Sequence, residues 1–459
     1  MIGGRRTWRG LILALLVGPF VFAAQSAPAQ DGLWQRDKLT GDWGGTRSAL
    51  EARGIVVGIA YIGETFTVPH GGLRSGSAYV GRAEGVINTD LEKLVGWKGA
   101  STHVRAFQFH NAGRLTNDLV GAHADPSNID ALATTRLYTA WFQQNFYNDA
   151  VSVRAGMLAA DDEFFTSTTA GGLINNTFGW ATPFSANIRS GGPASPFTAP
   201  GVRLALKPTN EIAFLAAVMG GDPAGRNCTE DDPQLCNRHG TKFRPAGGAL
   251  WMGELQYVVN QGEQAAGLAA AYKIGVWYAT DRYADQRFGV DPATGAILSL
   301  ATDPAPEPLF HERNWGLYGV IDQMLWRAGE RSASVFVRAG MAPSDRNTVA
   351  WYVDGGIGFK GPFAGRPNDL LTLGFAHSRL SGRLADLDRD TLALNGPPYP
   401  IRSAETVFEA SYSVQLAPWW TVQPDVQYIV RPGGNVPHPD TDEPVRNAFI
   451  VGVRSSVNF

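Results

Sequence analysis

The stretch that decides the fold is RNAFIVGVRSSVNF, residues 446–459, because its side chains divide into two sets of opposite character. Successive side chains of an extended chain point to opposite faces. Phe449, Val451, Val453, Val457 and Phe459 share one face, whereas the Gly, Arg, Ser and Asn at positions 452, 454, 456 and 458 share the other. The stretch therefore predicts a two-faced strand, as found in soluble β-sandwiches and in membrane barrels.

The composition of the whole chain separates these two classes. Charged residues make up 18% of the 459 residues, below the roughly 25% of an ordinary soluble domain. Beyond the first few dozen positions there is no apolar run of about 20 residues, the length that a membrane-spanning helix needs. Only helices and closed barrels satisfy their backbone polar groups in lipid, so a membrane protein of this composition must be a barrel.

The N-terminus has the pattern of an export signal. Arginines at positions 5, 6 and 9 precede the apolar stretch LILALLVGPFVFAA (11–24), and Ala27-Pro28-Ala29 provides a small-residue cleavage site. A retained anchor helix is the alternative, but the apolar stretch is short for a membrane span. We expect residues 1–29 to be a signal peptide, residues 30–54 a periplasmic segment with a short helix, and residues 55–459 the outer-membrane barrel.

The net charge of the chain excludes nucleic acid as a partner. The formal charge is −3, and it falls to about −6 without residues 1–29, which carry three arginines and no acidic residue. The remaining chain has no basic tract, which a nucleic-acid-binding surface would require.

The strands are predicted from alternating apolar and polar residues bounded by turn residues. Sixteen segments have this pattern, an even number as expected for a bacterial outer-membrane barrel. They are residues 55–64, 77–89, 101–111, 135–146, 151–161, 200–207, 211–219, 249–258, 266–279, 314–325, 332–342, 351–360, 369–378, 404–415, 421–430 and 446–459.

The connections between these segments are predicted to alternate between long and short, starting with a long one after the first strand. Short connections include YNDA (147–150) and PTN (208–210), and long ones include 112–134, 162–199, 220–248, 280–313 and 379–403. An outer-membrane barrel has short periplasmic turns and long extracellular loops. The fold class is therefore all-β, a transmembrane antiparallel barrel of about sixteen strands.

Charged residues recur on one face of the predicted strands. Val202, Leu204 and Leu206, for example, alternate with Arg203. A charge facing lipid at the bilayer midplane costs roughly 2–4 kcal/mol, so these residues are expected to point into the barrel. About sixteen strands enclose a lumen wide enough to conduct solutes.

The chain has two cysteines, Cys228 and Cys236, in a segment rich in turn residues. In an oxidising compartment they are expected to form a disulfide that closes a small loop. A metal pair with His239 is the alternative, but the number and spacing of ligands do not match a zinc site. We expect neither a metal nor a cofactor.

Four stretches in order along the chain resemble the carbohydrate-selective porin family (OprB-type). They are LTGDWGGTRSALEARGIVVGIAYIGETF (39–66), RLYTAWFQQNFYNDAVSVRAGMLAADDEF (136–164), PGVRLALKP followed by GDPAG (200–225), and ETVFEASYSVQLAPWWTVQPDVQYIVRPGG (405–434). Thr139 and Ala140 depart from the family pattern, which tends to have an acidic residue and leucine there. The resemblance implies a sixteen-stranded channel in the outer membrane of a Gram-negative cell that passes mono- and oligosaccharides by diffusion.

Strand alternation supplies the candidate residues of a sugar path, because sugar hydroxyls both donate and accept hydrogen bonds. The predicted pore-lining residues are Arg82, Glu84, Arg105, Arg154, Arg203, Arg338, Glu409, Gln423, Asp425 and Gln427, together with Trp180 of the connection 162–199. The segment 162–199 is the best candidate to fold inward and narrow the pore. Its Phe164, Phe165, Phe178 and Trp180 either stack on sugar rings or anchor the loop to the wall. Asp162 and Glu163 of the segment, and Asp161 just before it, are expected to pair with lumen arginines.

Other functions fit the sequence less well. An enzyme built on a barrel would need a serine, a histidine and an acid within reach, and no G-x-S-x-G motif is present. A general or anion-preferring porin without sugar selectivity is the main alternative. The expected partners are sugars in transit, outer-membrane lipid, and the outer-membrane assembly machinery through Phe459, with the barrel a monomer or a homotrimer.

Overall fold

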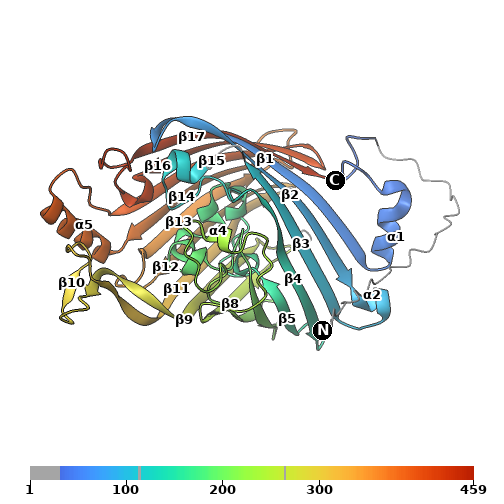
Figure 1. Cartoon of the computed structure of the whole chain (residues 1–459). Coiled ribbons are helices and arrows are strands. Elements are labelled where there is room, and N and C mark those ends of the chain that lie inside the picture. Colours follow the sequence, from blue (N-terminus) through green and yellow to red (C-terminus); the bar gives the residue numbers. More distant parts are fainter. Residues whose placement is uncertain (1–31, 112–114, 263–264) are drawn as a thin grey trace, which may run out of the picture.

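The computed structural model describes residues 32–111, 115–262 and 265–459, and their strands form one closed antiparallel sheet (Figure 1). Sixteen strands make the ring, and the predicted sixteen-stranded antiparallel barrel is confirmed. In order around the ring they are β1 (Ile55–Gly72), β2 (Gly76–Asp90), β3 (Ala100–Asn111), β4 (Thr134–Phe146), β5 (Val151–Leu158), β6 (Ala199–Leu206), β7 (Ile212–Gly220), β8 (Ala249–Val259), β9 (Ala270–Val290), β11 (Glu307–Ala328), β12 (Arg331–Met341), β13 (Val349–Lys360), β14 (Leu370–Leu380), β15 (Ala404–Ala417), β16 (Trp420–Val430) and β17 (Arg446–Asn458).

The ring closes between its last and first strands. β17 pairs with β1 in antiparallel register from Ala60 opposite Asn458 onward, and the Phe459 amide donates to the Ile59 carbonyl at 2.9 Å. Arg47, on helix α1 (Thr46–Ala52), donates to the carbonyl of Phe459 at 2.9 Å. Closure leaves neither edge strand with unpaired backbone groups, which would be costly in lipid.

The two faces of the sheet have the character that the sequence predicts. Val202, Leu204 and Leu206 on β6 are 45%, 37% and 39% exposed on the outside, whereas Arg203 between them is 3% exposed. On β17, Ile450 and Arg454 face inward, and Arg454 binds Glu64 of β1. The outer surface is therefore apolar and the inner surface polar.

One end of the barrel, the turn end, carries short connections and lies on the right in Figure 1. It includes turns 147–150, 207–211, 329–330 and 418–419, helix α1 and helix α2 (Leu91–Val95). The segment before α1 packs on the turn between β15 and β16, where the Trp419 indole donates to the Leu33 carbonyl at 2.8 Å. The predicted signal peptide, residues 1–29, lies outside the described residues.

At the opposite end, the loop end, three predicted connections differ from the structure. The first is not a long loop, because β1 and β2 continue outward and only residues 73–75 join them. Region 280–313 is largely strand: β9 and β11 extend beyond the ring, and β10 (Ile297–Ser299) pairs with β9. Region 379–403 contains helix α5 (Gly382–Asn395). In the second region, residues 281–287 (DRYADQR) carry charged residues on both faces, so they lack the alternation that marks a lipid-facing strand.

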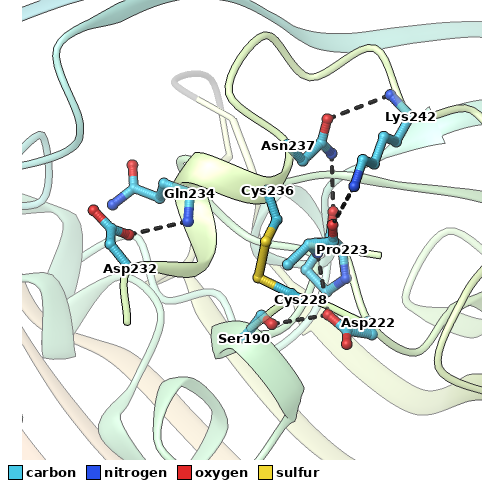
Figure 2. The surroundings of a disulfide bond; sticks show 10 residues. Ser190, Asp222, Pro223, Cys228, Asp232, Gln234, Cys236, Asn237 and Lys242 are labelled. Atoms are coloured by element: carbon cyan, nitrogen blue, oxygen red, sulfur yellow. Dashed lines mark hydrogen bonds between the residues drawn. A yellow bond between two sulfur atoms is a disulfide. The ribbon is translucent and has the colours of Figure 1, made fainter. Parts of the chain in front are cut away.

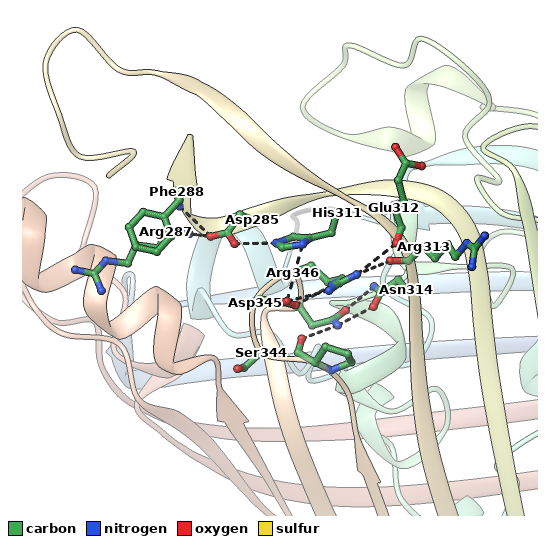
Figure 3. Close-up of polar contacts among 12 residues, drawn as sticks. Asp285, Arg287, Phe288, His311, Glu312, Arg313, Asn314, Ser344, Asp345 and Arg346 are labelled. Carbon is green, nitrogen blue, oxygen red and sulfur yellow. Dashed lines mark hydrogen bonds and ion pairs between the residues drawn. The ribbon is translucent and has the colours of Figure 1, made fainter. Parts of the chain in front are cut away.

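Polar contacts hold the extension of β9 and β11 to the neighbouring loop, where Arg346 donates to the Arg313 carbonyl of β11 at 3.0 Å (Figure 3). The Nε2 atom of His311 lies 2.8 Å from the Asp285 carboxylate, and its Nδ1 atom lies 3.9 Å from the Asp345 carboxylate. Arg346 binds both oxygens of Asp345. Side-chain contacts thus connect neighbouring segments of the loop end.

The connection between β5 and β6, residues 159–198, folds into the barrel; we call it the inner loop. It contains helix α3 (Thr182–Ser185) and several single-turn 3₁₀ helices. Its large apolar side chains, Phe164, Phe165, Phe178, Trp180 and Phe184, are each at most 3% exposed. Among the described residues, no helix is long and apolar enough to span a membrane.

Candidate functional site

A polar cavity of about 510 Å³ lies against the wall formed by β2 to β5, on the side that the inner loop leaves open. We call it the charged cavity. Side chains of β2, β3, β4 and β5 and the start of the inner loop line it. They are Glu84, Val86, Asn88, His103, Arg105, Trp141, Arg154, Asp162 and Glu163.

A β-bulge in β4 brings Trp141 into the charged cavity. Arg105 of β3 pairs with Thr139, but Ala106 pairs with Leu137, so Tyr138 is an extra residue without a partner. The extra residue reverses the alternation of β4 beyond this point. Opposite Trp141, Gly156 has a φ of +147°, and a Cβ atom there would lie 2.2 Å from the Ala140 carbonyl oxygen. Glycine is thus required for the close approach of β5 to β4.

The first group of charges in the cavity is a chain of alternating sign. Arg82 donates to Glu84 at 3.2 Å, and Arg105 donates to the other oxygen of Glu84 at 2.7 Å. Arg105 also lies 3.8 Å from Asp162 of the inner loop. Each charge in this chain has a partner of opposite sign, which reduces the cost of holding it in the barrel.

The second group joins β5 and β6 to the inner loop through Glu163. Arg203 donates to Glu163 at 2.9 Å, and Arg154 lies 3.4 Å from the same carboxylate oxygen. Both arginines also donate to the Gln143 side-chain oxygen at 3.0 Å. The Arg203 side chain is 4% exposed and the Arg154 side chain is 17% exposed, so Arg154 is the more accessible of the two to a solute.

Trp141 positions the polar groups on either side of it. The Arg154 guanidinium carbon lies 3.9 Å from the centre of the Trp141 ring, a cation–π contact. The His103 ring stacks on Trp141 with centroids 4.8 Å apart, and its two nitrogens lie 2.7 Å from Asn88 and 2.9 Å from Thr139. The rotamers of Arg154 and His103 are therefore fixed by packing as well as by hydrogen bonds.

Asp162 lies on the inner loop, outside the strands, and is not fully ionised near neutral pH. Burial raises the pKa of Asp162 to about 7, and the nearby Asp161 carboxylate adds to the effect, whereas Arg105 opposes it. A carboxyl group in this state both donates and accepts hydrogen bonds.

On the far side of the lumen, carboxylates of the barrel wall bind the backbone of the inner loop. Glu254 of β8 accepts from the Phe165 amide at 2.8 Å, and Asp322 of β11 accepts from the Thr169 amide at 2.9 Å. Glu409 of β15 accepts from two successive amides, those of residues 174 and 175, at 2.5 and 3.0 Å. Buried backbone amides need such partners because they have left water.

Arg338 of β12 binds carbonyl groups of the inner loop, as the carboxylates bind its amides. It donates to the Phe165 and Thr177 carbonyls at 3.2 and 3.1 Å and pairs with Asp354 of β13. The Tyr352 hydroxyl donates to the same aspartate at 2.7 Å. The Arg338 and Asp354 side chains are both 0% exposed, so a solute in the lumen does not reach them.

The structure therefore separates the predicted pore-lining residues into two groups. Arg82, Glu84, Arg105, Arg154 and Arg203 come together at or beside the charged cavity. The others lie beneath the inner loop or belong to it, where they bind protein groups: Arg338, Glu409, Gln423, Asp425, Gln427 and Trp180. Arg338, Glu409, Asp425 and Gln427 are at most 4% exposed, so they do not line the open lumen as predicted, whereas Gln423 is only partly buried.

Sequence reasoning missed Trp141, His103 and Asn88. The inward position of Trp141 follows from the bulge at Tyr138, which strict alternation does not reveal. Of the three acidic residues predicted to pair with lumen arginines, Asp162 and Glu163 do so, whereas Asp161 accepts from the Tyr138 hydroxyl and the Ser195 amide. The aromatic residues of the inner loop anchor it: Trp180 stacks on Phe184 with centroids 4.5 Å apart.

A second cavity, of about 540 Å³, lies at the loop end and is called here the outer cavity. Three connections line it: residues 116–132, residues 176–197 of the inner loop, and residues 231–234. The last of these belongs to the loop closed by the disulfide between Cys228 and Cys236, whose Cα atoms lie 5.8 Å apart (Figure 2). In the part of the chain that the structure describes, no three His, Cys, Asp or Glu side chains gather as metal ligands would.

Comparisons with known proteins agree on one family. Residues 74–459 match the family described as carbohydrate-selective porin, OprB family. Porin B of Pseudomonas aeruginosa is 26% identical over 452 residues, which cover 92% of this chain and 91% of that protein.

Two solved structures of Pseudomonas putida OprB share the fold. The high-pH structure has a TM-score of 0.81 at 22% identity and covers 94% of this chain and 100% of that chain. The low-pH structure has a TM-score of 0.54 at 17% identity and covers 93% of this chain and 99% of that chain.

The anchoring of the inner loop can be tested with Arg338→Met. The variant leaves Asp354 buried without its cation, so we expect the free energy of unfolding to fall by about 3–5 kcal/mol. Because the loop loses two anchors, the single-channel conductance is also expected to rise. Urea unfolding and planar-bilayer recording measure the two effects.

The matched control is Arg446→Met, at an exposed arginine of β17. It is expected to change neither quantity. An Arg338→Met protein as stable as the wild type, with an unchanged conductance, would show that the loop does not depend on this anchor.

Proposed function

This chain belongs to the carbohydrate-selective OprB porin family, and we propose that sugars cross its barrel through the charged cavity between the inner loop and strands β2 to β5. The protein is a non-enzymatic outer-membrane channel of that family. In our proposal the turn end faces the periplasm and the loop end faces the outside, the arrangement of outer-membrane barrels.

The observation that carries the proposal is that each arginine at the charged cavity contacts an acidic side chain. A pure anion filter would present arginines alone, but here Arg105 and Arg154 lie beside Glu84, Asp162 and Glu163. Paired charges give a solute both donors and acceptors while exerting little net attraction on an ion. This chemistry suits a neutral polyol.

Accessible side chains of the cavity would replace part of the hydration shell of a sugar. The Arg105 and Asp162 side chains are 29% and 34% exposed, and Asn88 and His103 lie beside them. Each of these groups already has a protein partner. A hydrogen bond to a sugar hydroxyl would therefore replace an existing hydrogen bond and contribute little net free energy of binding. Weak contacts favour transport, because a tightly bound solute would not leave.

The proposal is tested by liposome swelling with glucose and with glutamine, a neutral solute of similar size. We expect the wild type to admit glucose faster. In Arg154→Ala we expect the ratio of glucose to glutamine rates to fall about fivefold, the equivalent of one lost hydrogen bond. Arg446→Ala, at the exposed first residue of β17, is the control.

Equal rates for both solutes in the wild type would contradict sugar selection and favour the alternative, a general or anion-preferring diffusion porin. A preference that survives Arg154→Ala unchanged would place the sugar path elsewhere in the lumen.

We further propose that the outer-membrane assembly machinery recognises the β17 end that carries Phe459. This residue lies at the seam, where its amide binds the Ile59 carbonyl of β1. In cells, Phe459→Ser is expected to lower the amount of assembled barrel several-fold, whereas the refolded variant keeps the wild-type conductance. A variant that assembles at wild-type levels in cells would contradict the proposal.

A further inference from the structure

We propose that the outer cavity is a second sugar-binding site, which captures the solute at the loop end before it reaches the charged cavity. The inference rests on the proposed function, since it takes the same class of ligand. It adds a site about which sequence alternation says nothing, because connections between strands form its walls.

The size of the outer cavity suits a mono- or disaccharide. Its volume of about 540 Å³ lies within the roughly 300–1,000 Å³ of small-molecule sites. Its apolar lining includes Trp180, Ile188 and Phe197 of the inner loop and Leu132 of the connection before β4. A solute held there would lie on the loop side of the inner loop.

The polar groups of the cavity match a sugar more closely than an ion. Within the described residues, the side chains of Asn117, Asn176 and His123 line the cavity and make no hydrogen bond with the protein. Amide groups both donate and accept, as sugar hydroxyls do. Acidic side chains from residues 125, 130 and 231 also line the cavity, and carboxyl groups can exchange hydrogen bonds with sugar hydroxyls.

The walls of the outer cavity are held in place before a ligand arrives. Gln234, inside the disulfide loop, accepts from the Leu132 amide at 2.9 Å. Ser190 of the inner loop donates to Asp222, at the base of the same connection, at 2.8 Å (Figure 2). The disulfide closes residues 228–236 into a loop that includes Gln234. A preorganised site loses less entropy on binding.

The experiment uses the purified full barrel in planar bilayers, with maltose added to one side at a time. Current fluctuations give the binding constant from each side. We expect Asn117→Ala and Asn176→Ala each to weaken loop-side binding about fivefold, the equivalent of one hydrogen bond. The conductance without sugar is expected to stay unchanged.

Neighbouring residues supply matched controls. Asp118→Ala changes the adjacent exposed residue of the same helical turn (Leu115–Val120), which does not line the cavity. Asp231→Asn removes a negative charge from the cavity lining, and Glu230→Gln removes a negative charge from the adjacent residue, which does not line the cavity. We expect Asp231→Asn to weaken binding, and Asp118→Ala and Glu230→Gln to bind as the wild type does.

The disulfide gives an independent test, because Cys228→Ser with Cys236→Ser frees one wall of the cavity. Loop-side binding is expected to weaken in this double variant too. Wild-type binding constants in all the cavity variants would overturn the proposal, as would equal losses in the control variants.

The swelling ratio of Arg154→Ala reports on the charged cavity alone. A failure of the proposed sugar path therefore appears as an unchanged swelling ratio, whereas a failure of the outer site appears as unchanged loop-side binding.

Discussion

The backbone of the inner loop must find hydrogen-bond partners inside the barrel, and the rest of the structure depends on this constraint. A chain segment of forty residues in the lumen carries amides and carbonyls that have left water. Glu254, Asp322 and Glu409 accept from its amides, and Arg338 donates to its carbonyls. Because these partners lie on β8 to β15, the inner loop covers that side of the lumen and leaves β2 to β5 open.

The same arrangement explains the chemistry of the open side. The start of the inner loop presents Asp162 and Glu163 to Arg105, Arg154 and Arg203. The loop therefore supplies two acidic groups of the charged cavity, whereas the barrel wall supplies the arginines and Glu84. Neither the loop nor the wall alone would give the balanced polarity that a neutral sugar needs, so the fold of the loop and the selectivity of the channel are linked.

The sequence predicted the barrel well because lipid imposes a simple rule on every strand. The alternation of Val202, Leu204 and Leu206 with Arg203 is enough to place that strand and both its faces. Alternation does not say what an inward side chain meets. Glu409 and Gln427 point inward as predicted, but they bind the inner loop, whose residue 174 lies 235 positions away in sequence from Glu409.

Two further differences between expectation and structure have local causes. Trp141 faces the charged cavity because Tyr138 is an extra residue in β4, and a single bulge is invisible to a count of alternating residues. The extension of β9 carries charged residues on both faces, as in residues 281–287 (DRYADQR), so its sequence resembles that of a loop. The sequence thus predicts the strands and their two faces, because the contrast between lipid and water sets them. It does not predict features that depend on contacts between segments far apart in the sequence.

Cysteine accessibility tests most directly whether solutes pass along β2 to β5 and not along β15. Asn88→Cys places a thiol in the charged cavity, whereas Ser411→Cys places one beneath the inner loop, where Ser411 is 1% exposed. The two native cysteines form a disulfide and do not compete for reagent. We predict that a charged methanethiosulfonate reagent lowers the conductance of Asn88→Cys and leaves Ser411→Cys unchanged. Rapid block of Ser411→Cys with no effect on Asn88→Cys would contradict this account of the pore.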